Sequence, residues 1–96
     1  MKRAQVLELL APSKPTLADR FAVIDLALFG STVRDAARVD SDIDILVSFD
    51  GPATSQRYFG VQFFLEDLLG RPVDLVTDKA LRRELRPFIE KEAVHV

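Results

Sequence analysis

Apolar and polar positions alternate clearly from Asp42 to Phe49, and this period of two predicts a β-strand. One face of the strand receives the side chains of Ile43, Ile45, Val47 and Phe49. The opposite face receives Asp42, Asp44, Leu46 and Ser48. Mostly apolar runs at residues 23–29 and 73–76 predict two more strands, and residues 93–96 predict a short strand at the sheet edge.

Helices are predicted between these strands. Residues 55–69 form an amphipathic pattern, with an apolar face made by Val61, Phe64, Leu65 and Leu68. Ser31 is expected to cap a helix that runs to about Ala37. Thr77 or Asp78 is expected to cap a last helix, which Pro87 would break or kink.

The N-terminal segment predicts two short helices. Residues 2–10 have helical spacing, Pro12 and Pro15 are expected to end that helix, and Thr16 is expected to cap a second helix that reaches Phe21. With the later elements, this alternation of helices and strands predicts an α/β fold in which helices cover a sheet of three or four strands.

The composition narrows the class of protein. A chain of 96 residues predicts a single domain spanning 1–96, and 48% hydrophobic with 29% charged residues is typical of soluble globular proteins. No stretch approaches the roughly 18 apolar residues of a membrane span. Cysteine is absent, which excludes disulfides. We therefore expect a cytoplasmic protein without a membrane partner, and the net charge of −2 argues against direct binding of nucleic acid.

Two short motifs contain the residues that are candidates for binding phosphate and a metal ion. Gly30 and Ser31 lie at a predicted strand-to-helix turn, where glycine lets the backbone approach a ligand and free N–H groups favour a phosphate. Asp42 and Asp44 are two residues apart on a strand, so both carboxylates leave the same face. Such a pair is mutually repulsive unless a cation lies between the two groups, and its hard oxygen ligands suit Mg²⁺.

Asp74 interrupts the apolar strand at residues 73–76. If that strand lies beside the one that begins at Asp42, Asp74 lies about 5 Å away laterally and completes a cluster of three carboxylates. Two metal ions in such a cluster can stabilise the attacking and leaving oxygens of an in-line displacement. Each motif by itself is explained by a turn, a cap or a solvated charge, but the combination favours a catalytic site.

The motifs together resemble the GS-x10-D-x-D signature of the nucleotidyltransferase superfamily that includes DNA polymerase β. Here the signature is Gly30-Ser31, ten residues, then Asp42 and Asp44. Residues 28–34, 41–47, 72–76 and 89–94 are similar to the minimal nucleotidyltransferases, the MNT family. The resemblance implies a small mixed β-sheet flanked by helices.

The resemblance also implies the roles of single residues. Asp42, Asp44 and Asp74 would bind metal, with two Mg²⁺ ions expected, and would form the catalytic centre. Gly30 and Ser31 would contact the triphosphate of ATP, the expected substrate. Arg34 fits the family's GS-x-x-R and either meets phosphate or is a surface charge.

MNT proteins are paired with HEPN proteins, which are helical RNases, in toxin–antitoxin modules. The resemblance therefore implies a HEPN partner that receives AMP on a tyrosine hydroxyl, with this chain as the antitoxin. Two alternatives remain open: a non-catalytic module that neutralises the toxin by binding it, and transfer to a small molecule. The second is disfavoured because larger members bind their acceptor with an additional helical domain that this chain lacks.

The remaining notable side chains are expected to serve structure. Asp25 is interpreted as an edge charge, His95 as a plain terminal residue, and the basic stretch 79–86 as a solvated helix face. The aromatic cluster on the predicted helix over residues 55–69 packs in the core or forms a partner surface; its members are Tyr58, Phe59, Phe63 and Phe64.

Overall fold

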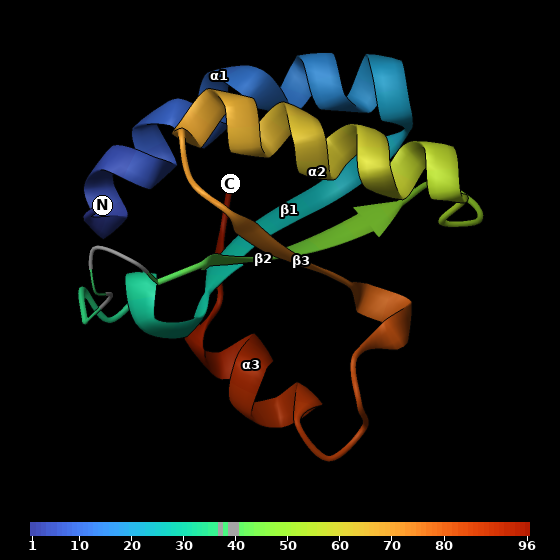
Figure 1. Cartoon of the computed structure of the whole chain (residues 1–96). Helices are drawn as coiled ribbons and strands as arrows, with labels where there is room; N and C mark the ends of the chain where they lie inside the picture. The colour runs from blue at the N-terminus through green and yellow to red at the C-terminus, as the bar shows by residue number, and fades with distance from the viewer. Residues whose placement is uncertain (37, 39–40) are drawn as a thin grey trace.

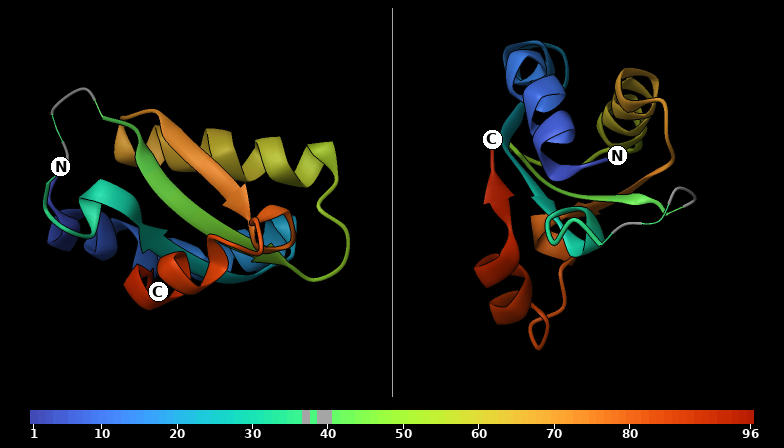
Figure 2. Two further views of the ribbon diagram at one scale, coloured as in Figure 1. Left: turned by 90° about the horizontal axis from the view of Figure 1, so that it is seen from below. Right: turned by 90° about the vertical axis from the view of Figure 1, so that its left-hand side faces the viewer.

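The fold is a mixed α/β sandwich, and the computed structural model describes residues 1–36, 38 and 41–96. Its elements are α1 (Arg3–Phe21), β1 (Val23–Phe29), the 3-10 turn η1 (Gly30–Thr32), β2 (Ile43–Phe49), α2 (Ser55–Leu69), β3 (Val73–Thr77), the 3-10 turn η2 (Asp78–Ala80), α3 (Arg86–Glu92) and β4 (Val94–His95). Helices α1 and α2 cover one face of the sheet, and α3 lies on the other side (Figures 1 and 2). The predicted fold class is confirmed.

The sheet has the strand order β3-β2-β1-β4. Strand β1 runs antiparallel to both β2 and β4, whereas β2 and β3 are parallel. The parallel pair follows from α2, which returns the chain to the end of the sheet where β2 began. The predicted short strand near the C-terminus is present as β4 at the sheet edge.

The main core lies between the sheet and the two helices α1 and α2. The apolar alternation of β2 points to this side, as predicted, and leucines and valines of α1 and α2 meet it. Each fully buried leucine stabilises the fold by about 1.5–3 kcal/mol. The largest fully buried side chains are Leu10, Leu17, Leu26, Leu28, Ile43, Ile45 and Leu65.

The opposite side of the sheet, called here the second face, carries a smaller apolar cluster. Ala27 of β1 and Leu46 of β2 are buried there beneath Leu81, with Phe29, Val76, Ile89 and Ala93 packed around them. Because α3 covers only part of this face, polar side chains of the strands remain accessible at its ends. One of these ends carries the predicted carboxylates.

Helix α1 is continuous from Arg3 to Phe21, so the predicted break at Pro12 and Pro15 is wrong. An internal proline costs a helix about 3 kcal/mol. Both rings lie on the exposed side, and the buried face continues past them through Leu10 and Leu17, whose complete burial offsets the cost. Neither α1 nor any other helix in the described part of the chain is long and apolar enough to cross a membrane.

After β1 the backbone makes the single 3-10 turn η1 instead of the helix predicted over residues 31–37, of which Ala37 lies outside the described residues. Asp35 adopts a left-handed φ of 53°, which ends the helical path. Arg3 fixes this conformation from α1. Its backbone N–H donates to Asp35 Oδ1 at 2.8 Å, and its Nη1 donates to the carbonyl of Val33 at 3.4 Å. Tertiary contacts therefore replace the local helix.

The C-terminal helix begins later than predicted. Thr77 Oγ1 accepts the N–H of Ala80 at 3.2 Å and so caps η2, whereas α3 begins at Arg86. Pro87 consequently lies in the first turn of α3, where a missing N–H costs nothing, and it neither breaks nor kinks the helix. The segment between η2 and α3 is anchored by Leu81, which is buried on the second face.

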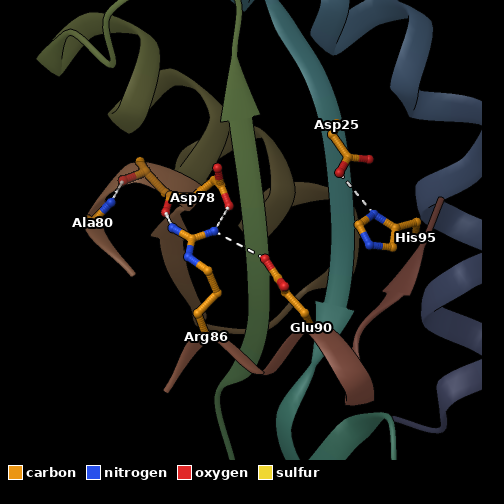
Figure 3. Close-up of polar contacts among 7 residues, drawn as sticks. Asp25, Asp78, Ala80, Arg86, Glu90 and His95 are labelled. Atoms are coloured by element: carbon orange, nitrogen blue, oxygen red, sulfur yellow. Dashed lines mark hydrogen bonds and ion pairs between the residues drawn. The ribbon is translucent and has the colours of Figure 1, made fainter. Parts of the chain in front are cut away.

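Asp25 lies near the start of β1, where β1 pairs with β2 but not with β4, because the pairing with β4 covers Ala27 and Leu28. Its Oδ2 lies 2.9 Å from Nδ1 of His95, which therefore has a structural partner (Figure 3). Arg86 Nη1 lies 2.8 Å from Asp78 Oδ1 and 3.2 Å from Glu90 Oε1, and the same view marks both contacts. The His95 contact attaches β4 to β1, and the pair of Arg86 with Asp78 attaches α3 to η2.

Candidate active site

Asp44 and Asp74 lie directly opposite each other, because the parallel register of β2 and β3 pairs them. Neighbouring strands are about 4.8 Å apart. Side chains along a strand alternate between the two faces of the sheet. Asp44 and Asp74 therefore project from the second face, like Leu46 and Val76 two residues further along their strands. Asp42 precedes β2 and is exposed. The sequence analysis expects Asp74 to lie beside the other carboxylates only if its strand neighbours theirs. Strands β2 and β3 are neighbours, and the structure therefore places Asp74 beside Asp44.

The charge of Asp44 is disfavoured by its surroundings, which raise its pKa to about 6. Burial is the largest cause, followed by the negative charge of Asp74 and a side-chain hydrogen bond with Asp74. The charges of Asp42 and Glu92 add to the effect. All these causes oppose ionisation, so a cation that neutralised the cluster would bring Asp44 back to its charged form.

Gly30 packs against the Asp44 carboxyl group. A Cβ atom added at Gly30 would overlap Asp44 Oδ2. The backbone φ of +75° at Gly30 also lies in the left-handed region that glycine adopts without strain. Gly30 therefore brings the turn and the acidic strand together, which explains physically why glycine precedes Ser31 in this motif.

Ser31 lies half-buried in η1, and its carbonyl accepts the N–H of Ala36 at 2.9 Å. A 3-10 turn of three residues lacks the aligned N–H groups of a helix start. An anion here would therefore rely on the Ser31 hydroxyl, the turn backbone and nearby cations, rather than on the helix N-terminus expected from the sequence. The neighbouring Thr32 hydroxyl is buried and has no hydrogen-bond partner among the described residues.

Arg34 is exposed beside η1, and its Nη1 lies 2.6 Å from Oε1 of Glu92 at the end of α3. The structure thus gives Arg34 a defined ion pair close to the predicted phosphate turn. No role is expected for Glu92 from the sequence, although its charge acts on Asp44. No local pattern could have indicated this contact, because the two residues are 58 positions apart.

The donor set at this end of the sheet suits a hard cation. Asp44 and Asp74 offer adjacent carboxylate oxygens, and Asp42 lies close enough for its charge to act on Asp44. Mg²⁺ binds through one or two carboxylates, retains several waters and takes the remaining ligands from phosphates. In the described part of the chain, no three or more His, Cys, Asp or Glu side chains are already gathered into a metal site. The residues fit a metal completed by water and substrate.

The aromatic residues of α2 and a pocket at the far ends of β2 and β3 lie away from these carboxylates. On α2, the rings of Phe59 and Phe63 are 49% and 63% exposed, so these two residues do not pack in the core. Tyr58 instead anchors α2 by donating its hydroxyl hydrogen bond to the carbonyl of Leu75 at 2.6 Å. A pocket of about 210 Å³ lies at the far ends of β2 and β3, and none of the predicted site residues lines it.

Comparisons with known proteins agree with the geometry. Residues 13–96 match the family described as nucleotidyltransferase domain. The chain belongs to this family. It is 36% identical to protein adenylyltransferase MntA of Thermococcus cleftensis over 96% of this chain and 93% of that protein. The resemblance found in the sequence is therefore confirmed, and with it the prediction that the protein is a nucleotidyltransferase enzyme.

Solved structures share the fold. A minimal nucleotidyltransferase superposes with a TM-score of 0.77 at 34% identity, covering 98% of this chain and 95% of that one. A second solved structure is a complex of a tri-AMPylated HEPN toxin with an MNT antitoxin from Shewanella oneidensis. One of its chains superposes on this protein with a TM-score of 0.59 at 20% identity, and the match covers 97% of this chain and 66% of that chain. At 20% identity, this second similarity shows a shared fold and nothing more.

Proposed function

We propose that this chain, as a single minimal domain of residues 1–96, transfers AMP from ATP to a tyrosine hydroxyl of a HEPN-type toxin and acts as its antitoxin. The name of the Thermococcus cleftensis relative supports protein adenylylation, and the Shewanella oneidensis complex supports an AMPylated HEPN partner. ATP is a cellular metabolite, so the proposed reaction takes place in the cytoplasm.

The observation that carries the proposal is the pairing of Asp44 with Asp74 against Gly30. Two carboxylates placed side by side repel each other when both are charged, and this repulsion weakens the fold unless a cation is bound. Folding alone gives no reason for such a pair, whereas phosphoryl chemistry needs it. Mg²⁺ held by Asp42, Asp44 and Asp74 would supply charge neutralisation at the triphosphate.

The transfer step needs positioning more than covalent chemistry by the protein. The oxygen of the acceptor hydroxyl attacks the α-phosphorus of ATP and forms the new P–O bond. The bond from the α-phosphorus to the oxygen that bridges to the β-phosphate breaks, and pyrophosphate leaves with the electron pair. Asp74, which is exposed, accepts the hydroxyl proton and passes it to water. Gly30, Ser31 and Arg34 hold the phosphates during this step.

Labelling with α-³²P ATP and Mg²⁺ tests the proposal. The purified chain is incubated with and without a HEPN-type protein encoded beside it, and the label on the partner is measured. We expect label with the wild type and with Asp67→Asn, a carboxylate variant on the exposed surface of α2, but none with Asp42→Asn/Asp44→Asn. If no triphosphate labels the partner despite a stable complex, the proposal is wrong and the protein acts as a binding module.

The binding-module alternative has its own discriminating result. Protection of cells from the toxin by Asp42→Asn/Asp44→Asn, at wild-type strength, would indicate neutralisation by sequestration. Loss of protection with binding of the toxin retained supports catalysis. Labelling of an aminoglycoside by the purified chain alone would instead support transfer to a small molecule.

A further inference from the structure

The C-terminal segment contacts the candidate site through the side chain of Glu92. Strand β4 pairs with β1 in a register that aligns Leu28 with Val94, so the end of α3 lies beside the end of β1, where η1 begins. Glu92 is the last residue of α3. From this position it forms the 2.6 Å ion pair with Arg34 on the other side of the turn.

The two partners of this pair are unequally fixed. The side chain of Glu92 is 29% exposed, whereas that of Arg34 is 57% exposed. A long arginine side chain on the surface samples many rotamers unless a partner restricts it. Glu92 engages Nη1, so the remaining donors of the planar guanidinium stay available to a second anion.

We propose that Glu92 is a positioning residue that holds the guanidinium of Arg34 beside the Gly30–Ser31 turn, ready for the phosphates of the nucleotide. The inference rests on the proposed function, because it assumes that Arg34 meets phosphate. A prepositioned side chain has less freedom to lose on binding, which strengthens the affinity for nucleotide. Arg34 in turn offsets the negative charge that Glu92 adds near Asp42, Asp44 and Asp74.

A double-mutant cycle tests this coupling. The dissociation constant of Mg²⁺ with α,β-methylene ATP is measured by calorimetry for the wild type, Arg34→Ala, Glu92→Ala and the double variant. We expect Arg34→Ala to weaken binding about tenfold and Glu92→Ala about threefold or more. The double variant should bind within about twofold of Arg34→Ala, because Glu92 acts through Arg34.

Two further variants separate positioning from a general effect on the fold. Glu92→Gln keeps an oxygen that accepts from the guanidinium and should restore most of the affinity lost in Glu92→Ala. Glu90→Ala removes a carboxylate of the same helix that pairs with Arg86, and it should leave the affinity unchanged. Thermal melts confirm that each variant is folded.

The outcomes distinguish this inference from the proposed function. If the wild type binds no triphosphate, both are wrong. If it binds and Glu92→Ala binds equally well or more tightly, Glu92 does not position Arg34, although the enzyme assignment stands. The inference is also overturned if Arg34→Ala has no effect, or if Glu92→Ala weakens binding further when Arg34 is already alanine.

Discussion

At the scale of single residues, the candidate site is built around Asp44, which faces Asp74 on the neighbouring strand and is approached by Gly30 of η1. Asp44 and Asp74 were placed on strands by the apolar residues on either side, and their pairing then required only that the strands be neighbours. The contact of Gly30 with Asp44 and the ion pair of Arg34 with Glu92 depend on three-dimensional packing. Alternation along a strand contains no information about such contacts.

The raised pKa of Asp44 predicts that Asp44→Asn stabilises the protein at neutral pH without metal. A raised folded-state pKa contributes stability below the ordinary value of 3.8, and this contribution is lost as the pH rises through about 6. The upper bound is about 3 kcal/mol, and solvent screening of a half-buried group reduces it to about 1 kcal/mol. Urea unfolding in EDTA should show this gain at pH 7.5 and none near pH 3.5. Equal stability at pH 7.5 would contradict the electrostatic account.

Gly30→Ala is expected to abolish binding of Mg²⁺–ATP, because its Cβ would displace the Asp44 carboxyl group. Gly70→Ala is the matched control, since Gly70 has a similar φ of +66° but open space around it. Both variants should lose about 1–2 kcal/mol of folding free energy from the left-handed backbone. Calorimetric titration with nucleotide should then separate them. Retained binding by Gly30→Ala would show that the close approach to Asp44 is dispensable.

At the scale of elements, predictions succeeded where the local pattern and the tertiary packing agree. Strands β1 and β2 and helix α2 were predicted within a residue of their observed bounds because apolar spacing decides both their type and their buried face. The predictions of breaks in α1 and of a helix after Ser31 were wrong. In α1 the free energy gained by burying apolar side chains exceeds the cost of the two prolines. After Ser31 the contacts of Arg3 with Asp35 and Val33 stabilise a turn in place of a helix.

The continuous α1 predicts that Pro15→Ala stabilises the fold by about 2 kcal/mol. Alanine restores an N–H donor toward the carbonyl of Ala11 and removes the ring clash, and the more flexible unfolded chain offsets part of the gain. Pro87→Ala, in the first turn of α3, should change stability by less than about 0.5 kcal/mol. Chemical denaturation measures both. A loss of stability in Pro15→Ala would mean that the helix depends on its prolines.

At the scale of the whole molecule, the two faces of the sheet divide structure from chemistry. The face under α1 and α2 contains the main core, whereas the second face is only partly covered and presents Asp44 and Asp74 at one end. Four segments meet there: η1, the start of β2, the start of β3 and the end of α3. The resemblance to the MNT family covers all four segments along the chain, but the position of the end of α3 beside the other three follows from the pairing of β4 with β1.

The central claim is that this site transfers a nucleotidyl group, which means attack at the α-phosphorus of ATP. The most direct measurement compares α-³²P ATP with γ-³²P ATP in parallel reactions with the HEPN-type partner and Mg²⁺. Our account predicts that the partner acquires the α label and never the γ label, and that Asp44→Asn/Asp74→Asn abolishes the transfer. Transfer of the γ label would indicate a kinase-like reaction, and label from neither position would contradict catalysis at this site.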